Sequence, residues 1–294
     1  MIDRRSLIAA AAASIAMGCR PAPDPDRQDV ALTGNGLFDD LARKFYGGIG
    51  LSALDTGSGR RIDFDAISRY AMCSTFKLPL AGMVLALNDA GKLRLDERIG
   101  FGPDDLVPYA PFIERQMDRG EATLAELCQA AVTVSDNVAA NLLLRRIGGP
   151  QAFTQWLRGV GDTTTRLDRI EPDLNSNLPG DSRDTTTPGA MLDTVNRLVL
   201  GDALTPASRG QLAQWMVACE TGDNRLRAGV PSEWRVGDKT GTSTNGASND
   251  VAIIWPPERA PILIACFINC DTVTARDRDA AHAKVADRIL TEFS

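Results

Sequence analysis

Residues 74–87 read STFKLPLAGMVLAL, and the run at 78–87 is apolar around nearly the whole circumference of a helix. A helix without a polar face is stable where other elements cover it on every side. We therefore predict a fully buried helix at the centre of the fold. Ser74 and Lys77 stand at its start, and their spacing places both side chains on one helix face.

Apolar runs on both sides of this helix predict strands at the two ends of the chain. Residues 49–54 and 60–64 flank the turn sequence Thr56-Gly57-Ser58-Gly59 and read as a hairpin. Residues 234–237, 250–255 and 262–268 read as three more strands, and the apolar positions of 285–293 lie on one face of a final helix. We predict an α+β fold, an α/β sandwich. Both chain ends form its antiparallel five-stranded sheet with flanking helices, and an all-α domain is inserted between them.

The inserted part carries repeated helix signals. Thr123 with Glu126 forms a capping box, and Thr187-Pro188 and Thr205-Pro206 each place a capping residue before a proline. We expect a sheet domain at 35–68 and 221–294 and a helical domain at 69–220. Within the helical domain, residues 166–184 belong to a long stretch rich in Asp, Asn, Pro and Gly, and loops of that length are usually functional or disordered. We interpret residues 166–184 as an active-site loop.

The first residues have the pattern of an export signal. Arg4 and Arg5 precede an apolar segment at 7–17 that is too short to span a bilayer. We assign residues 1–20 to a signal peptide, of the twin-arginine or the ordinary Sec type, and 21–34 to a proline-containing linker. Cys19 follows Gly18 and is the candidate site of a lipid anchor. No later apolar run reaches transmembrane length, so we expect an exported, periplasmic protein, free or tethered through Cys19.

Composition excludes several classes of function. The chain has 294 residues with a net charge of −6, and this acidic balance argues against nucleic-acid binding. It contains one histidine, His282, and six cysteines without a CxxC pair, so we expect no metal and no cofactor. A hydrolase built on this chain would activate its nucleophile with lysine or a carboxylate. We expect His282 to be solvated or packed in its helix, and the Arg-Asp-Arg-Asp run at 276–279 to form a solvated face.

Four short motifs could carry chemistry. Ser74-Thr75-Phe76-Lys77 places a hydroxyl one turn from an amine whose pKa burial would lower, which makes the lysine a candidate base. The other three are Ser135-Asp136-Asn137, Lys239-Thr240-Gly241 and Glu171-Pro172-Asp173-Leu174-Asn175. Each of the four motifs has an ordinary structural alternative. Ser74 with Lys77 could be a capping serine and a surface lysine, Ser135-Asp136-Asn137 a helix cap, Lys239-Thr240-Gly241 a strand end, and the Glu171 motif part of an ordinary loop. Arg169 and Asp184 bracket the loop motif and could pair to hold the loop closed.

Together these motifs resemble those of the class A serine β-lactamases, over essentially the whole mature chain at about 37–294. Ser-x-x-Lys, Ser-Asp-Asn and Lys-Thr-Gly are shared with the penicillin-binding proteins. Glu171 with Asn175 matches the loop motif that separates class A enzymes from those relatives. The resemblance implies hydrolysis of the β-lactam ring of penicillins and cephalosporins, hence antibiotic resistance, by a monomer without a cofactor.

The resemblance also implies roles for individual residues. Ser74 would attack the lactam carbonyl and form an acyl-enzyme, with Lys77, or Glu171 through a water, as the base. Backbone N–H groups of Ser74 and Thr242 would form the oxyanion hole. Ser135 would relay a proton to the leaving nitrogen, and Glu171 with Asn175 would activate the deacylating water. Substrate contacts are expected from Asn137, Asn175, Lys239, Thr240, Gly241, Thr242, Tyr109 and Arg225.

The sequence departs from parts of the family at its cysteines. Cys73 precedes the nucleophile, but Ser243 stands where its disulfide partner lies in the carbapenemases. Cys128 matches one half of another family disulfide, but Ala81 stands where its partner would be. We therefore expect neither disulfide. Many members of the family bind the substrate carboxylate with an arginine on the strand after Lys-Thr-Gly, but residues 246–250 contain none. Arg225 matches the alternative arginine of other branches. Two other functions stay open: a penicillin-binding peptidase acting on D-Ala-D-Ala termini, and a non-catalytic β-lactam-sensing domain.

Overall fold

The computed structural model describes residues 36–294, so the predicted signal peptide, linker and Cys19 lie outside the described residues. Its main feature is a five-stranded antiparallel sheet in the order β2-β1-β9-β8-β7. The strands are β1 (Ile49–Asp55), β2 (Arg61–Phe64), β7 (Arg235–Thr242), β8 (Ala247–Trp255) and β9 (Ile262–Asn269). Both chain ends supply strands to this sheet, which confirms the predicted α+β fold.

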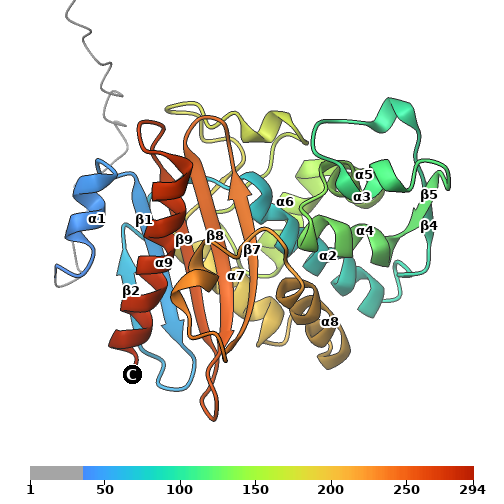
Figure 1. The fold of residues 1–294 in the computed structure, drawn as a ribbon. Helices are drawn as coiled ribbons and strands as arrows, with labels where there is room; N and C mark the ends of the chain where they lie inside the picture. The colour runs from blue at the N-terminus through green and yellow to red at the C-terminus, as the bar shows by residue number, and fades with distance from the viewer. Residues whose placement is uncertain (1–35) are drawn as a thin grey trace, which may run out of the picture.

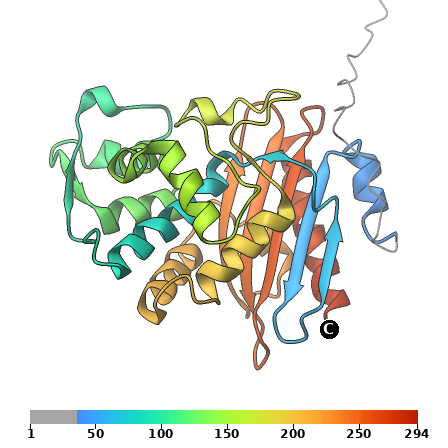
Figure 2. The same ribbon diagram turned by 180° about the vertical axis from the view of Figure 1, so that it is seen from behind.

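Helices cover both faces of the sheet. In Figure 1, α9 (Ala275–Glu292) lies across the near face, and Figure 2 shows α7 (Pro188–Val199) on the opposite face. α1 (Asp39–Lys44) lies beside the edge formed by β2 and β1. Because both faces are covered, β8 and β9 are buried along almost their whole length. This explains why β9 reads as a continuous apolar run instead of an alternating one.

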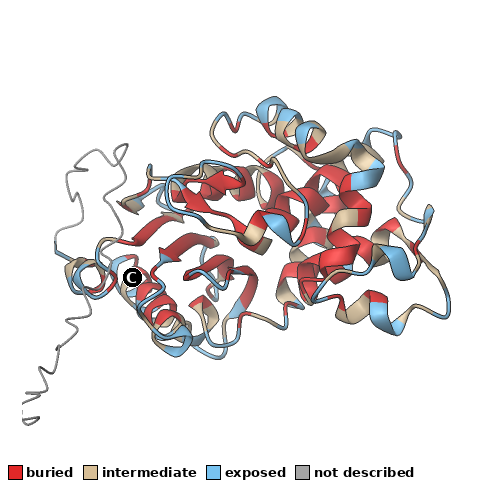
Figure 3. Cartoon of the chain, turned by 90° about the horizontal axis from the view of Figure 1, so that it is seen from above, coloured by how far each residue is buried: buried red, intermediate tan, exposed pale blue. Residues whose placement is uncertain are grey.

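The remaining helices form a second group, with α2 at its centre. They are α2 (Lys77–Asp89), α3 (Pro111–Arg115), α4 (Leu124–Thr133), α5 (Asn137–Ile147), α6 (Gly149–Gly159) and α8 (Pro206–Val217). Residues 77–85 of α2 are all buried, whereas residues 86 and 87, which the prediction included, are half-buried. Figure 3 shows buried residues concentrated in the sheet and the central helices, with exposed residues on the outer turns. Two strand pairs and four 3₁₀ helices complete the described fold: β3 (Tyr70–Ala71) with β6 (Thr185–Thr186), β4 (Arg98–Gly100) with β5 (Glu121–Thr123), and η1 (Cys73–Phe76), η2 (Pro103–Asp105), η3 (Asp173–Asn175) and η4 (Leu226–Gly229).

Side chains cap the helices at the predicted positions. Thr123 and Glu126 form a reciprocal capping box at the start of α4. Thr187 and Thr205 accept backbone hydrogen bonds at the starts of α7 and α8, each followed by proline at the first helical position. Local sequence therefore sets where these helices begin.

Two local predictions are wrong. The strand expected at 234–237 continues to Thr242, because residues 239–242 keep pairing with β8 although they lack a strand-like apolar pattern. The run at 276–279 is not a solvated face throughout. Arg278 is 9% exposed and donates to carbonyls of the preceding turn, and Asp279 pairs with Arg225 at 2.9 Å.

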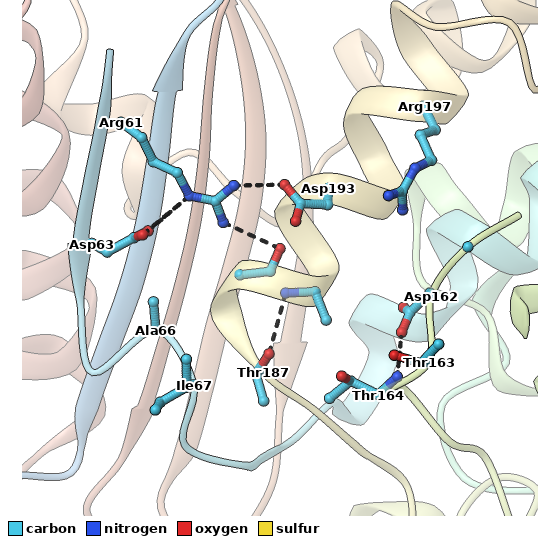
Figure 4. A pocket seen from close by; sticks show the side chains of 13 residues that line it. Arg61, Asp63, Ala66, Ile67, Asp162, Thr163, Thr164, Thr187, Asp193 and Arg197 are labelled. Atoms are coloured by element: carbon cyan, nitrogen blue, oxygen red, sulfur yellow. Dashed lines mark hydrogen bonds and ion pairs between the residues drawn. The ribbon is translucent and has the colours of Figure 1, made fainter. Parts of the chain in front are cut away.

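A polar contact joins β2 to α7 (Figure 4). Arg61 donates to Asp63 at 3.0 Å and to Asp193 at 2.7 Å, so one guanidinium bridges a strand and a helix. A cavity of about 280 Å³ opens beside this contact. None of the candidate catalytic or substrate-binding residues lines this cavity.

Candidate active site

Ser74 and Lys77 meet at the junction of η1 and α2. Lys77 Nζ donates to Ser74 Oγ at 2.9 Å, and both residues belong to one continuous helical turn. Cys73, just before the serine, has a φ of +46°, a strained value for a non-glycine residue. Strain of this kind is typical of sites where surrounding structure fixes a reactive side chain. The predicted serine–lysine contact is therefore present.

The Lys77 amine is the centre of a buried hydrogen-bond network. It also donates to Ser135 O at 2.8 Å and Asn137 Oδ1 at 2.6 Å, and it pairs with Glu171 Oε1 at 2.9 Å. The side chains of Lys77 and Glu171 are both 0% exposed. Burial lowers the pKa of Lys77, and the Glu171 carboxylate opposes that change. An amine with a lowered pKa takes part in proton transfer more readily than a solvated lysine.

Ser135 lies between the two lysines of the site. Its hydroxyl is 3.4 Å from Lys77 Nζ and accepts a hydrogen bond from Lys239 Nζ at 3.0 Å. The turn between α4 and α5 sets this position, where Ser135 has a φ of +58°. Asp136 fixes the turn, because its buried carboxylate accepts from the backbone N–H groups of Phe112, Ile113 and Ala139.

β7 supplies the second lysine. Lys239 is fully buried, and its amine also donates to the Thr240 carbonyl at 2.7 Å. Burial lowers the pKa of Lys239 to about 7. The amine is therefore close to its charged–neutral midpoint at neutral pH.

Gly241 brings β7 against Ser74. A Cβ at this position would lie 2.6 Å from Met72 O, closer than a side chain permits, and 3.2 Å from Ser74 N, a tight contact. The absence of a side chain thus lets the β7 backbone approach the Ser74 N–H. Next to it, Thr242 Oγ1 accepts from Arg225 at 2.7 Å, and the same guanidinium donates to Gly241 O at 3.0 Å.

The active-site loop brings Glu171 to the serine. At its base, Arg169 pairs with Asp184 at 2.6 Å, as the sequence suggested. Glu171 Oε1 accepts from Ser74 Oγ at 3.3 Å, and Glu171 Oε2 accepts from Asn175 Nδ2 at 2.5 Å. One carboxylate therefore contacts the hydroxyl, the lysine and the loop amide at once.

Comparison with known proteins agrees with this geometry. A sequence model of the β-lactamase enzyme family matches residues 37–293. β-Lactamase AST-1 of Nocardia asteroides is 42% identical over 293 residues, which cover 97% of this chain and 93% of that protein. The carbapenem-hydrolyzing β-lactamase KPC of Klebsiella oxytoca is 44% identical over 250 residues, or 85% of each chain.

Solved structures show the same fold. An ancestral (GNCA) class A β-lactamase superposes with a TM-score of 0.84 at 53% identity, covering 87% of this chain and 100% of that one. A β-lactamase from Xanthomonas campestris gives a TM-score of 0.85 at 48% identity, covering 88% and 97%. The chain belongs to the class A β-lactamase family.

The structure of this class A β-lactamase adds two residues that sequence reasoning missed. Asn141 holds the Glu171 backbone from both sides, donating to its carbonyl and accepting from its N–H at 2.9 Å each. Asn141 lies one helical turn after Asn137 on α5, so helix periodicity could have indicated it. Thr221 shares a 2.6 Å hydrogen bond with the Thr240 hydroxyl, and no local pattern marks it.

Two predicted substrate contacts stand at the rim of this β-lactamase site. Tyr109 is 57% exposed with a φ of +66°, and its carbonyl accepts from Asn137 N at 3.0 Å. The Asn137 side chain donates to Pro108 O at 2.7 Å, while its oxygen faces Lys77. The Asn137 amide thus ties the rim segment to the central lysine.

The cysteines of the described region are not cross-linked. Cys73, Cys128, Cys219, Cys266 and Cys270 are free and buried, so neither family disulfide forms. Among residues 36–294, no group of His, Cys, Asp and Glu side chains could hold a metal ion. In the same region, no helix is long and apolar enough to cross a membrane.

Proposed function

We propose that this class A β-lactamase opens the β-lactam ring of penicillins and cephalosporins through an acyl-enzyme on Ser74. The contact that supports this most directly is Glu171 Oε1, 3.3 Å from Ser74 Oγ and 2.9 Å from Lys77 Nζ. A hydroxyl nucleophile and a carboxylate at one point fit a reaction with an acylation and a deacylation step.

In acylation, Ser74 Oγ attacks the lactam carbonyl and gives its proton to a base. Lys77 and Glu171 both contact the hydroxyl, so either can receive that proton, Lys77 in its neutral form. The N–H groups of Ser74 and Thr242 stabilise the oxyanion, which the close approach at Gly241 makes geometrically accessible. Ser135, hydrogen-bonded to Lys239, passes a proton to the leaving nitrogen.

Substrate binding uses the residues of β7 and the segment at 107–111. Lys239, Thr240 and Thr242 hold the substrate carboxylate, with Arg225 behind Thr242 adding positive charge. Asn137 and Tyr109 contact the substrate side chain at the rim. A planar carboxylate suits this mixture of hydroxyl and cationic donors.

In deacylation, Glu171 takes a proton from a water that attacks the acyl-enzyme. Asn175 Oδ1 is buried and has no hydrogen-bond partner among the described protein atoms, so it can accept from that water. This second step makes the protein a catalyst, because a serine that stays acylated is an inhibited one.

The same proposal covers organisation and location. The described chain divides into a sheet domain at 36–68 and 221–294 and a helical domain at 69–220, with the site between them. The buried hydrophobic residues form two clusters, one on each face of the sheet. One lies wholly within the sheet domain, and the other joins the helical domain to the sheet through Val251, Ile253, Leu263, Ala265 and Phe267. We propose an exported, periplasmic monomer whose first residues direct export.

Turnover of a chromogenic cephalosporin tests the function. We expect purified protein to hydrolyse many substrate equivalents per enzyme. A single stoichiometric burst would instead indicate a penicillin-binding peptidase or a sensing domain, since both acylate without rapid release.

Replacing Glu171 tests the division of labour. Glu171→Ala should slow turnover by about 100-fold or more, because the general base for deacylation is lost. Intact-protein mass spectrometry should then show a persistent substrate adduct. Asp173→Asn, an exposed acid on the same turn, is the matched control and should behave like the unmodified enzyme. Unchanged turnover with no lasting adduct would remove Glu171 from its role.

A further inference from the structure

Three asparagines join the middle of the active-site loop, at residues 176–177, to the sheet. Asn177 Nδ2 donates to Asn245 O at 2.7 Å and to Asn269 Oδ1 at 2.8 Å. Asn245 Nδ2 donates back to Ser176 O at 2.6 Å. We call Asn177, Asn245 and Asn269 the amide latch. Asn245 lies in the turn between β7 and β8, and Asn269 ends β9.

The sheet side of the latch is firmly seated. Gly246, next to Asn245, has a φ of +84°, and a Cβ there would lie 2.4 Å from Asp271 N. Only glycine fits this combination of backbone angle and close packing. The Asn245 backbone also donates to Ser243 Oγ at 3.1 Å, so the turn presents its side chain from a fixed base.

The loop side of the latch leads directly to the catalytic carboxylate. Ser176, whose carbonyl the latch holds, directly follows η3 and donates from its N–H to Asp173 O at 3.3 Å. Asn175, the residue before it, donates to Glu171 Oε2. Asn177 has a φ of +43°, a conformation that asparagine tolerates better than most residues. Its side-chain bonds therefore hold a bent loop segment in place.

Other contacts hold the rest of the loop, but at different points. Asn141 fixes the Glu171 backbone, Arg169 and Asp184 close the loop base, and Leu174 is 1% exposed in the core. Among the hydrogen bonds of the described residues, only those of the latch tie positions 176–177 to the sheet. Asn175 also donates to Pro172 O, from its side chain and from its backbone at 3.1 Å each, but both bonds stay within the loop. The latch is therefore the hydrogen-bonded link from the segment next to Asn175 to the sheet.

We propose that the amide latch positions Asn175, and through it the Glu171 carboxylate and its water, for deacylation. Ser74, Lys77 and Ser135 are held by α2 and the α4–α5 turn, which the latch does not touch. Loosening the latch therefore slows release of the acyl group and leaves its formation intact. This inference rests on the proposed acyl-enzyme mechanism.

The two half-reactions separate kinetically. In a scheme with an acyl-enzyme, kcat/KM reports the steps up to acylation, whereas slow deacylation lowers kcat and KM together. A variant that merely leaves some protein unfolded lowers kcat at constant KM. The ratio of these effects distinguishes a positioning role from a general loss of structure.

The experiment compares Asn245→Asp and Asn177→Asp with two controls in the same turn. Each aspartate keeps the size of the side chain but removes the donating N–H group and places a carboxylate beside carbonyl oxygens. Thr244→Asp adds the same charge without removing a latch donor, and Thr244→Ala tests the turn itself, since Thr244 is exposed and makes no side-chain hydrogen bond in the described structure. Steady-state constants and the steady-state acyl-enzyme fraction, by rapid-quench mass spectrometry, are measured with a penicillin and a chromogenic cephalosporin.

We expect both latch variants to lower kcat and KM by about tenfold with kcat/KM nearly unchanged, and to raise the acyl-enzyme fraction, as for a misplaced catalytic group. Both Thr244 controls should match the unmodified enzyme. The inference is overturned if the latch variants match the controls, or if they lose kcat at constant KM without accumulating acyl-enzyme. If the unmodified enzyme itself shows no turnover, the proposed function fails, which is a separate result.

Discussion

Among single residues, the two buried lysines differ in their partners. Lys77 faces a carboxylate at 2.9 Å, which favours its charged form. Lys239 bonds to the Ser135 hydroxyl and the Thr240 carbonyl, and neither carries a full charge. Burial consequently lowers the pKa of Lys239 to about 7. Since Lys239 is expected to bind the substrate carboxylate, its protonation should control substrate capture.

We predict that kcat/KM falls as pH rises through about 7. The pKa of free Lys239 is lowered, so its charge is present below that pH and is lost above it, which should reduce kcat/KM by about tenfold between pH 6 and pH 8. Lys239→Arg should remove this alkaline limb, because a guanidinium stays charged. A pH–rate profile checks both expectations. An identical alkaline limb in the arginine variant would contradict the assignment to Lys239.

The site residues show where sequence reasoning works. The contact of Ser74 with Lys77 is predictable because helix geometry alone places residues at this spacing together. The contact of Thr221 with Thr240 is not, since the two hydroxyls come from different segments and meet only after the sheet is assembled. The contacts of Glu171 with Ser74 and Lys77 could be predicted only through the family resemblance, because a loop motif does not specify where in the fold the loop packs.

At the level of elements, α9 is attached to the sheet through its histidine. His282 is 0% exposed, and its Nε2 lies 3.1 Å from Ser248 O on β8. Burial, with the nearby Arg225 guanidinium as a smaller cause, lowers the pKa of His282 to about 3. The helix thus docks with a neutral imidazole.

We predict that this contact makes folding acid-sensitive. In the unfolded chain the histidine binds a proton near its ordinary pKa of 6.5, whereas the folded pKa is about 3. The stabilisation is therefore complete above pH 6.5 and is lost progressively as pH falls from 6.5 to 3. His282→Gln should show a smaller decrease in Tm between pH 7 and pH 4 than the unmodified protein. Parallel Tm curves for the two proteins would contradict this reading.

The elements themselves are mostly predictable where the pattern is strong. The apolar run of α2 and the caps at Thr123, Thr187 and Thr205 locate their helices correctly. The extension of β7 to Thr242 is not predictable, because pairing with β8, and not an intrinsic preference, holds Lys239 and Gly241 in the strand. The buried state of Arg278 likewise depends on a neighbouring turn.

For the whole molecule, the described part of the chain is stabilised without disulfide cross-links. Its five cysteines are buried thiols, and burial raises the pKa of Cys73 to about 12 and that of Cys128 above its ordinary value. A thiol that is both inaccessible and protonated reacts slowly. Stability must then come from packing of the two hydrophobic clusters.

We predict that reducing agents leave Tm unchanged. A thiol-specific chromogenic reagent should react slowly with these five cysteines in the native protein and rapidly after denaturation, because unfolding exposes them and restores ordinary pKa values. Time courses with and without denaturant check this. A Tm that falls on reduction would reveal a disulfide within residues 36–294.

The order of strands has a consequence for biosynthesis. In the sheet, β1 lies between β2 and β9. β2 follows β1 directly in the chain, whereas β9 comes only after the whole helical insertion. A ribosome releases the chain from its N-terminus, so the first hairpin must wait, with one edge bare, while the helical insertion is completed. Loss of β9 would thus separate this hairpin from β8 and β7 and divide the sheet at its middle strand.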